Sequence, residues 1–379
     1  MKPNALLITR NLPPLIGGME RLNWHLAHEL SQHYNLTVVA PKRAESVMPT
    51  TINFFGAELN PLWKFLLTSL YICLRTVKKI KPEIVIAGSG LTAPAAFLSA
   101  KISGAKSVAY LHGLDVSVNN RIYRWLWLPM IKRMDLLIAN STPTANLIRQ
   151  LGVNDKRIRI IHPGVSRPAA PLNYKEIEEF KEKNGIEGKT VLLSVGRLTH
   201  RKGLLDFIAR SLPKIVKQHP NTILLIVGNS PNNALYAKEV TSLSLIEAAG
   251  KNNVANHVKF IGNIDDKALT QAMYASAVHV FPVKEIQGDP EGFGMVAIEA
   301  AVHGLPTVAF SVGGVADAVN NGISGYLVEQ KEYDLFSDRI LSILNEPTRL
   351  EKATCIAFAH QFEWSKFGEK LKLALSEIE

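Results

Sequence analysis

Short apolar runs rich in Val, Ile and Leu alternate with helical patterns along nearly the whole chain. Almost continuously apolar runs are typical of parallel strands buried on both faces. The predicted strands are 5–9, 36–40, 84–87, 107–111, 136–140, 158–162, 191–195, 222–227, 258–261, 278–281 and 307–310. The predicted helices include 20–33, 143–151, 202–217, 265–274 and 293–303. This order of elements predicts βαβ units and therefore an α/β chain with doubly wound sheets.

The alternation pauses once, between Pro163 and Lys189, where prolines and a charged segment replace any strand pattern. We place a domain boundary there, with a first domain at 1–167 and a second at 168–361. An amphipathic helix predicted at 362–379 is assigned to the first domain. The length of 379 residues agrees with two domains, because single cores stop growing at roughly 250–300 residues. Both domains are expected to be Rossmann-like and to face a central cleft.

Composition excludes several classes of protein. Hydrophobic residues make up 47% of the chain and charged residues 20%, which is too apolar for a disordered chain. Cys73 and Cys355, the two cysteines, are too few for a disulfide framework or a cysteine zinc site, which favours a reducing, cytoplasmic compartment. No apolar run reaches the roughly 20 residues of a membrane-spanning helix, so we expect a soluble or peripheral protein.

Charge is unevenly divided between the two halves. Residues 1–167 contain 21 Lys/Arg and 8 Asp/Glu, whereas the remainder contains 22 and 25. A basic half suits an anionic substrate, an anionic membrane or nucleic acid.

Two glycine-containing segments follow predicted strands and suit an anion. Gly17 and Gly18 precede a helix, where bare backbone N–H groups can approach negative charge; a tight turn explains them equally well. Arg197 and Lys202 lie between Gly196 and Gly203, at a strand end where open α/β sheets bind ligands. A guanidinium and an ammonium together suit a diphosphate, although a solvated basic loop is the alternative.

Two carboxylates stand eight residues apart around a helix start. Glu291 is predicted in a loop and Glu299 about two turns into the following helix, with Gly292 and Gly294 between them. A carboxylate among apolar residues is costly unless it has a partner. The hydroxyls of a ribose would provide one; an internal salt bridge is the alternative.

Other strand ends carry weaker signals. His112 follows the strand at 107–111, where a lone histidine gains functional weight next to a glycine. Gly88-Ser89-Gly90 matches a dinucleotide-binding pattern but does not open the first βα unit, so we interpret it as a close-packing turn. Smaller signals are Asn140–Thr142, His162–Gly164, Gly228–Ser230 and Gly313–Gly314.

Together these segments resemble the retaining glycosyltransferases of family 4, which have the two-lobed GT-B fold. The most specific parts are the Glu-x7-Glu element from Glu291 to Glu299 and the Gly-Arg-x4-Lys-Gly element from Gly196 to Gly203. Around Glu291 the chain looks especially similar to mannosyltransferases that act on phosphatidylinositol.

The resemblance implies a nucleotide-diphosphate sugar as donor. Arg197 and Lys202 would hold the diphosphate, Glu299 the ribose and Glu291 the sugar, with His112 facing the sugar near its reacting carbon. The resemblance also assigns donor contacts to Gly17, Gly18, Gly196, Gly262, Gly292, Phe293, Gly294, Met295 and Val296. Since fixed cations can stabilise the leaving phosphate and no Asp-x-Asp motif ends a strand, no metal and no cofactor are expected.

The expected reaction is retaining transfer of a hexose from GDP-mannose or a UDP-sugar to a lipid-linked or cell-envelope glycan acceptor. A same-face attack is implied, in which the leaving phosphate takes the acceptor proton. Alternatives are a soluble acceptor, a nucleotide-sugar epimerase, or a binding module without catalysis. Nucleic acid is not an expected partner, because the tryptophans look interfacial rather than arranged in a basic stripe.

The basic first domain also suggests a membrane partner. Segments 60–80 and 121–133 mix aromatic and basic residues, as helices at an anionic membrane interface do. A peripheral location at the inner face of the membrane follows, with a core helix bearing a solvated basic edge as the alternative.

Overall fold

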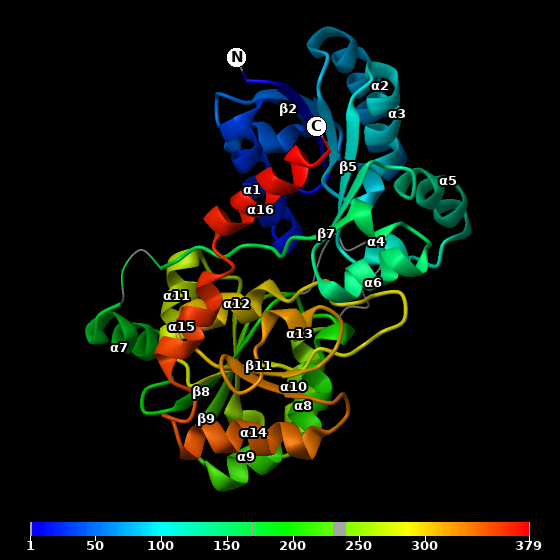
Figure 1. The fold of residues 1–379 in the computed structure, drawn as a ribbon. Coiled ribbons are helices and arrows are strands. Elements are labelled where there is room, and N and C mark those ends of the chain that lie inside the picture. The colour runs from blue at the N-terminus through cyan, green and yellow to red at the C-terminus, as the bar shows by residue number, and fades with distance from the viewer. Residues whose placement is uncertain (1, 169, 171, 230–239, 379) are drawn as a thin grey trace. The chain divides into compact units, whose positions relative to one another are not determined.

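A computed structural model describes residues 2–168, 170, 172–229 and 240–378. The chain divides into two compact units (Figure 1). Unit 1 comprises 1–164 and 364–379, and unit 2 comprises 165–363.

Unit 1 is built on a parallel sheet whose described strands run in the order β3-β2-β1-β4-β5-β6-β7. Because the order reverses between β1 and β4, the sheet is doubly wound. Its strands are β1 (Asn4–Ile8), β2 (Asn35–Pro41), β3 (Asn53–Ala57), β4 (Ile84–Ala87), β5 (Lys106–Leu111), β6 (Leu136–Ala139) and β7 (Ile158–Ile160). Its helices are α1 (Gly18–His33), α2 (Leu62–Ile80), α3 (Ala93–Ser103), α4 (Leu114–Ser117), α5 (Arg121–Ile131), α6 (Thr142–Gln150) and α16 (Trp364–Ser376), with 3-10 turns η1 (Lys42–Val47), η2 (Gly90–Thr92) and η3 (Asp155–Arg157).

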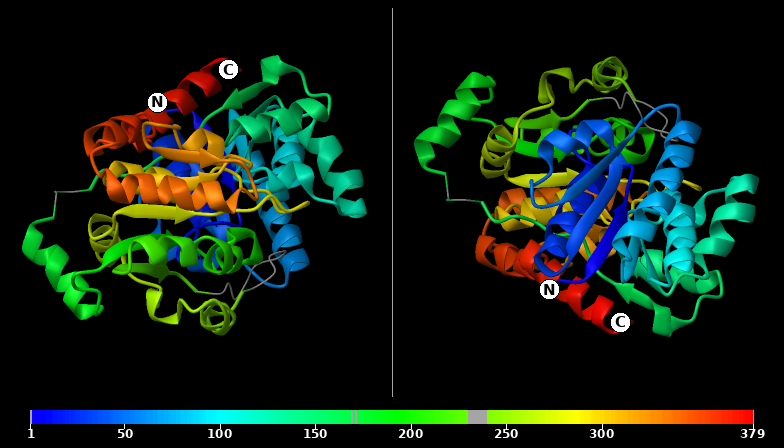
Figure 2. Two further views of the ribbon diagram at one scale, coloured as in Figure 1. Left: turned by 90° about the horizontal axis from the view of Figure 1, so that it is seen from below. Right: turned by 90° about the horizontal axis from the view of Figure 1, so that it is seen from above.

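The two faces of this sheet carry different helices. Helix α16 packs beside α1, while α2, α3 and α5 pack in a row against the opposite face (Figures 1 and 2). Trp364 of α16 stacks on His25 of α1, with ring centroids 3.7 Å apart and planes inclined by 8°. Helix α16, the last helix of the chain, therefore covers part of α1, the first helix.

Unit 2 has a parallel sheet with the described order β10-β9-β8-β11-β12-β13. Its strands are β8 (Thr190–Val195), β9 (Thr222–Val227), β10 (Val258–Gly262), β11 (Val278–Phe281), β12 (Thr307–Phe310) and β13 (Gly325–Val328). Its helices are α7 (Tyr174–Lys183), α8 (Leu204–Arg210), α9 (Leu212–Gln218), α10 (Ser242–Lys251), α11 (Asp266–Tyr274), α12 (Met295–Val302), α13 (Val315–Ala318), α14 (Tyr333–Asn345) and α15 (Lys352–His360), with η4 (His200–Lys202) and η5 (Ala255–His257). One core cluster packs α8, α10 and α14 against the sheet, and another packs α7 and α11.

The chain enters and leaves unit 2 at adjoining residues. Val165 donates its backbone N–H to the carbonyl of Phe362 at 2.7 Å and forms a parallel bridge with Glu363. Arg167 pairs with the carboxylate of Glu363 at 2.5 Å. The two ends of unit 2 are therefore linked by backbone hydrogen bonding and by an ion pair.

The predicted strands are confirmed to within two residues at their ends, and the α/β class is confirmed. Strands β3 and β13 were not predicted. The single helix predicted at 202–217 is wrong: η4, α8 and α9 occupy this region. The chain turns at Ser211, and Pro213 lies in the first turn of α9, where a proline is tolerated because its missing N–H would have no helical partner.

Candidate functional site

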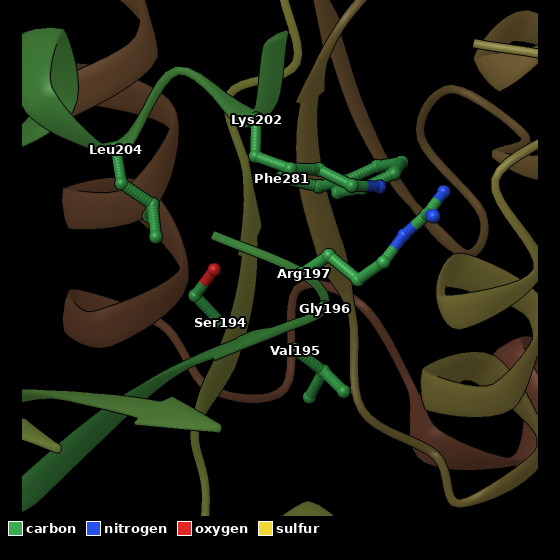
Figure 3. Close-up of a pocket in the computed structure, with 7 residues that line it drawn as sticks. All are labelled: Ser194, Val195, Gly196, Arg197, Lys202, Leu204 and Phe281. Atoms are coloured by element: carbon green, nitrogen blue, oxygen red, sulfur yellow. The ribbon is translucent and has the colours of Figure 1, made fainter. Parts of the chain in front are cut away.

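A pocket opens where β8 ends. It is a hollow open to solvent and is lined by Ser194, Val195, Gly196, Arg197, Lys202, Leu204 and Phe281. The cationic ends of Arg197 and Lys202 extend toward the same side of it (Figure 3). Arg197 is exposed and makes no hydrogen bond or ion pair with the residues that the structure describes. The two cations at this hollow suit an anionic part of a ligand.

Glycines bring three neighbouring strands close together beside the pocket. Gly196, Gly228 and Gly262 follow or end β8, β9 and β10, and Gly228 donates to the carbonyl of Gly262 at 2.8 Å. A Cβ on Gly228 would overlap the carbonyl of Gly196. The structure therefore places Gly228 between Gly196 and Gly262; Ser230, predicted in the same group, lies outside the described residues.

A second close approach fixes the backbone around Lys202. Gly203 has φ 72°, and a Cβ there would overlap the carbonyl oxygen of Pro282. Only glycine adopts this conformation without strain and also leaves room for that oxygen. The turn that carries Lys202 is consequently held against the end of β11.

Lys202 and Glu291 form an ion pair in which Arg201 takes part. The Lys202 ammonium lies 2.9 Å from Oε2 of Glu291, and the Arg201 guanidinium donates to the same oxygen. Arg201 Nε also lies 3.3 Å from Asp289 Oδ1. The ammonium of Lys202 stands 4.6 Å from the centre of the Phe281 ring, within range of a cation–π contact.

Burial and charge act in opposite directions on the pKa values of this cluster. Burial raises the pKa of Glu291, but Arg201 and Lys202 outweigh it and lower the value to about 2. Burial lowers the pKa of Lys202, Glu291 opposes this, and the net shift is downward. For Arg201, burial lowers the pKa while Glu291 and Asp289 raise it, with a net upward shift. Glu291 is therefore a carboxylate at neutral pH.

The two cations predicted for the diphosphate differ in exposure. The Lys202 side chain is only 15% exposed, whereas Arg197 is exposed, so a solvated basic loop describes Arg197 but not Lys202. Glu291 makes the internal salt bridge that was the alternative to ligand binding. Arg201 was not among the predicted site residues; its one signal in the sequence is its position next to Lys202 and Gly203.

The loop before α12 packs closely against the backbone of Gly314. Gly314 donates its N–H to the carbonyl of Glu291 at 2.9 Å, and a Cβ on Gly314 would overlap the carbonyl of Gly292. The side chain of Phe293 is buried in the core against Phe362, so any ligand contact of Phe293 would involve its backbone.

Helix α12 begins after Gly294, which has φ 89°. Met295 and Val296 form its partly buried first turn, and Glu299 lies half-buried farther along the helix. The helix presents its first backbone N–H groups at the end of the loop that carries Glu291, where negative charge is stabilised.

His112 in unit 1 is held in one orientation. Its backbone N–H donates to Asp115 at 2.8 Å, and Nε2 lies 3.0 Å from the carbonyl of Gly88. Because a carbonyl only accepts, Nε2 carries the hydrogen of this bond. His112 is 9% exposed and lies at the end of β5, as predicted from the sequence.

Four further glycines of unit 1 that the sequence singled out lie at a helix start or in close packing. Gly17 is the N-cap of α1 and Gly18 its first residue. A Cβ on Gly88 would overlap the side chain of Asn23, and one on Gly90 would lie 2.6 Å from the Tyr123 hydroxyl. Gly88 and Gly90 are thus in a close-packing turn, as interpreted.

Among the described residues, no group of three or more His, Cys, Asp or Glu side chains is arranged to hold a metal ion. Within the same residues, every helix is too short or too polar to cross a membrane.

Comparison with known families covers both halves of the chain. Residues 176–359 match the family model described as "Glycosyl transferases group 1", and residues 16–167 match the model "Glycosyltransferase Family 4". The chain belongs to the family 4 glycosyltransferases. The predicted resemblance is therefore confirmed.

Relatives of known activity align over nearly the whole of this glycosyltransferase. "Glycogen synthase" of Mycobacterium tuberculosis is 27% identical over 95% of the chain and 91% of its own length. "GDP-mannose-dependent alpha-(1-6)-phosphatidylinositol monomannoside mannosyltransferase" of Mycolicibacterium smegmatis is 26% identical over 98% of both chains.

Solved structures place the fold of the glycosyltransferase in the GT-B class. Anabaena Alr3699/HepE, crystallised with UDP and glucose, superimposes with a TM-score of 0.81 at 19% identity, covering 99% of this chain and all of that one. WaaG, described as a glycosyltransferase involved in lipopolysaccharide biosynthesis, gives a TM-score of 0.66 at 16% identity, covering 98% of both chains. The GT-B fold predicted from the sequence is confirmed.

Proposed function

We propose that this protein is a retaining hexosyltransferase that moves a sugar from GDP-mannose or a UDP-sugar to a hydroxyl of a lipid-linked or cell-envelope glycan. The observation that carries the proposal is the convergence of Arg197 and Lys202 on one pocket at the end of β8. Breaking the bond between sugar and phosphate leaves negative charge on a diphosphate. Fixed cations placed at that charge stabilise the transition state.

The remaining donor contacts follow from the loop before α12 and from the family assignment. Glu291 and the backbone from Gly292 to Met295 would hold the sugar, Val296 would lie at the same helix start, and Glu299 would bind the ribose. Gly196 and Gly262 would border the nucleotide. Gly17, Gly18 and His112 of unit 1 would meet the phosphates and the sugar.

We propose transfer without a metal ion or cofactor, because Arg197 and Lys202 supply the positive charge that a metal would otherwise provide. The leaving phosphate would accept the proton of the acceptor hydroxyl as the sugar is attacked on the same face. Transfer assayed with and without a chelator tests the first point, and full inhibition by EDTA would contradict it. Nuclear magnetic resonance of the product tests the second: the anomeric configuration should equal that of the donor.

Titration of the purified protein with nucleotide sugars tests donor use directly. A GDP- or UDP-sugar should raise the unfolding temperature, because a ligand of the native state stabilises it by mass action, and slow release of the nucleotide should accompany binding. If no nucleotide sugar binds at millimolar concentration, the proposed function is wrong.

Exposed apolar side chains on unit 1 support an acceptor at the cytoplasmic face of a membrane. Trp63, Leu67 and Tyr71 lie four residues apart along α2 and are 64%, 61% and 58% exposed. On α5, Ile122 and Trp125 are 66% and 77% exposed. Ile102 of α3, the helix that packs between α2 and α5, is 54% exposed.

The charge of these three helices favours an anionic lipid. Helices α2, α3 and α5 contain no Asp or Glu. Exposed basic residues stand among the apolar ones: Lys64, Arg75, Lys78, Lys79, Lys101, Arg121 and Arg124. Tyr123 and Trp127, which the sequence also suggested for this role, stack on each other at 5.6 Å, and Trp127 donates to the Leu91 carbonyl. Because Tyr123 and Trp127 make these contacts inside unit 1, we do not assign them to lipid binding.

Vesicle flotation tests this partner. The protein should float with vesicles containing phosphatidylglycerol at low salt, and much less with pure phosphatidylcholine or at high salt. A W63S/W125S variant should lose binding, whereas L243S, which removes an equally exposed side chain from unit 2 (69%), should not. Absence of binding to anionic vesicles at low salt would contradict a membrane partner.

A soluble glucan acceptor is the second candidate, and the relative that is a glycogen synthase favours it. Transfer to a lipid extract compared with transfer to soluble glucan separates the two. Epimerisation or simple binding of the nucleotide sugar would instead leave no transfer product.

A further inference from the structure

Arg201 is a buried cation that the proposed reaction leaves without a role. It is 9% exposed, although it lies in a basic run. Its guanidinium contacts Asp289 and Glu291, and its backbone carbonyl accepts a hydrogen bond from the N–H of Lys284 at 2.8 Å. Arg201 therefore connects the turn that carries Lys202 to the segment that leads to α12. Its backbone contacts this segment at Lys284, and its side chain contacts it at Asp289 and Glu291.

Arg201 and Lys202 share one acceptor. Both donate to Oε2 of Glu291, but Arg201 also contacts Asp289. Without Lys202, Glu291 would keep a cationic partner. Without Arg201, Lys202 would be the only positive charge for Glu291, and Asp289 would lose its partner. The two cations are therefore not equivalent. Lys202 can leave Glu291 at a small cost in free energy, because Arg201 still neutralises the carboxylate.

We propose that Arg201 is a positioning residue that holds Asp289 and Glu291 in place and thereby frees Lys202 to bind the diphosphate of the donor. The inference rests on the proposed function. In the structure Glu291 pairs with the Lys202 ammonium; the diphosphate would replace Glu291 there, while Arg201 keeps the carboxylate neutralised. The Phe281 ring, 4.6 Å from the ammonium, remains as a second support for Lys202.

The test compares nucleoside diphosphates with monophosphates by calorimetry. In R201Q, Lys202 would stay on Glu291, and the uncompensated carboxylate of Asp289 would face the incoming anion. Affinity for UDP or GDP, whichever the wild type binds, should fall by about tenfold or more, as expected when a charge-assisted contact is lost. Affinity for the monophosphate should change less, because a monophosphate lacks the second phosphoryl group.

The double variant R201Q/E291Q makes the test specific. Removing the charge of Glu291 should release Lys202 and restore most of the diphosphate affinity. The ligand is UDP or GDP, which carries no donor sugar. A contact between Glu291 and the donor sugar therefore cannot affect the measured affinity. R210Q is the matched control: Arg210 lies on α8 in the same unit and contacts the Tyr333 ring at 5.0 Å. It should bind like the wild type.

Two results would overturn the inference. One is an R201Q protein that binds the diphosphate as tightly as the wild type. The other is an equal loss for mono- and diphosphate that E291Q does not repair, which is the behaviour of a purely structural residue. If R201Q does not fold, R201K serves the same comparison, because a lysine keeps the charge but lacks the fork that bridges two carboxylates. A wild type that binds no nucleotide would instead refute the proposed function.

Discussion

Lys202 and Glu291 are 89 positions apart in the sequence, yet their charged groups lie 2.9 Å from each other at the end of β8. Arg197, which lines the same pocket, makes no such pair within the described part of the chain. One cation of the pocket is thus compensated internally and the other is open to a ligand.

Replacing either cation of the pocket should reduce transfer. R197A and K202A should each lower turnover by about 10²–10³-fold, the effect of removing one donor that stabilises developing negative charge. K217A removes an exposed lysine at the end of α9 and should have wild-type activity. Steady-state kinetics with the donor identified by titration would check this. Unchanged turnover in both pocket variants would exclude the proposed role.

The Glu291 ion pair should make stability depend on acid pH. The pKa of Glu291 is lowered from 4.5 to about 2 in the folded protein, because Arg201 and Lys202 outweigh the opposing effect of burial. The unfolded chain therefore binds more protons in this range. The contribution of the ion pair is present above about pH 4.5 and is lost as the pH falls toward 2.

Urea unfolding of the wild type and E291Q measures this contribution. Between about pH 6 and pH 3 the wild type should lose more free energy of unfolding than E291Q, which has no carboxylate to protonate at this position. Parallel losses in the two proteins would show that Glu291 is not ionised and paired in the folded state.

Gly203 should not tolerate a side chain. G203A forces a residue with φ 72° and brings its Cβ onto the Pro282 carbonyl, so it should destabilise the protein by at least about 2 kcal/mol and displace Lys202. G250A is the control, because Gly250 lies within α10 with open space around its Cβ position. It should be neutral or stabilising by up to about 1 kcal/mol. Thermal unfolding of both variants checks the difference, and equal behaviour would contradict the close approach of Gly203 to Pro282.

His25 should make unit 1 sensitive to mild acid. Burial, with the nearby charges of His28 and Arg21, lowers its pKa from 6.5 to about 3, so the ring stacked on Trp364 is neutral in the folded protein. The unfolded chain protonates first, and stability present above about pH 6.5 is lost as the pH falls toward 3. H25F should unfold with less pH dependence between about pH 7 and 5. H33F, at an exposed position of the same helix, should retain the dependence of the wild type.

The sequence predicted most strands because their apolar runs are nearly continuous. It missed β3, an edge strand whose side chains alternate between exposed and partly buried, and β13, a four-residue strand that begins with a glycine. A short or half-exposed strand has no strong hydrophobic pattern, and its pairing depends on a neighbour distant in the sequence.

For the site, the sequence predicted Arg197, Lys202 and Glu291 as functional residues, and the structure brings Lys202 and Glu291 into contact. It did not predict Arg201. A run of three basic residues is usually solvated, and only the carboxylates at 289 and 291 explain why this arginine is buried. Such a pairing depends on tertiary structure and cannot be read from local spacing.

The junction at Val165 and Phe362 has a consequence for synthesis of the protein. Unit 2 is an insertion within unit 1, so the ribosome must complete some two hundred intervening residues before Trp364 can reach His25. A nascent chain that stops after unit 2 leaves the first helix uncovered, whereas residues 165–363, whose ends are joined by their own hydrogen bond, form a segment suited to separate expression.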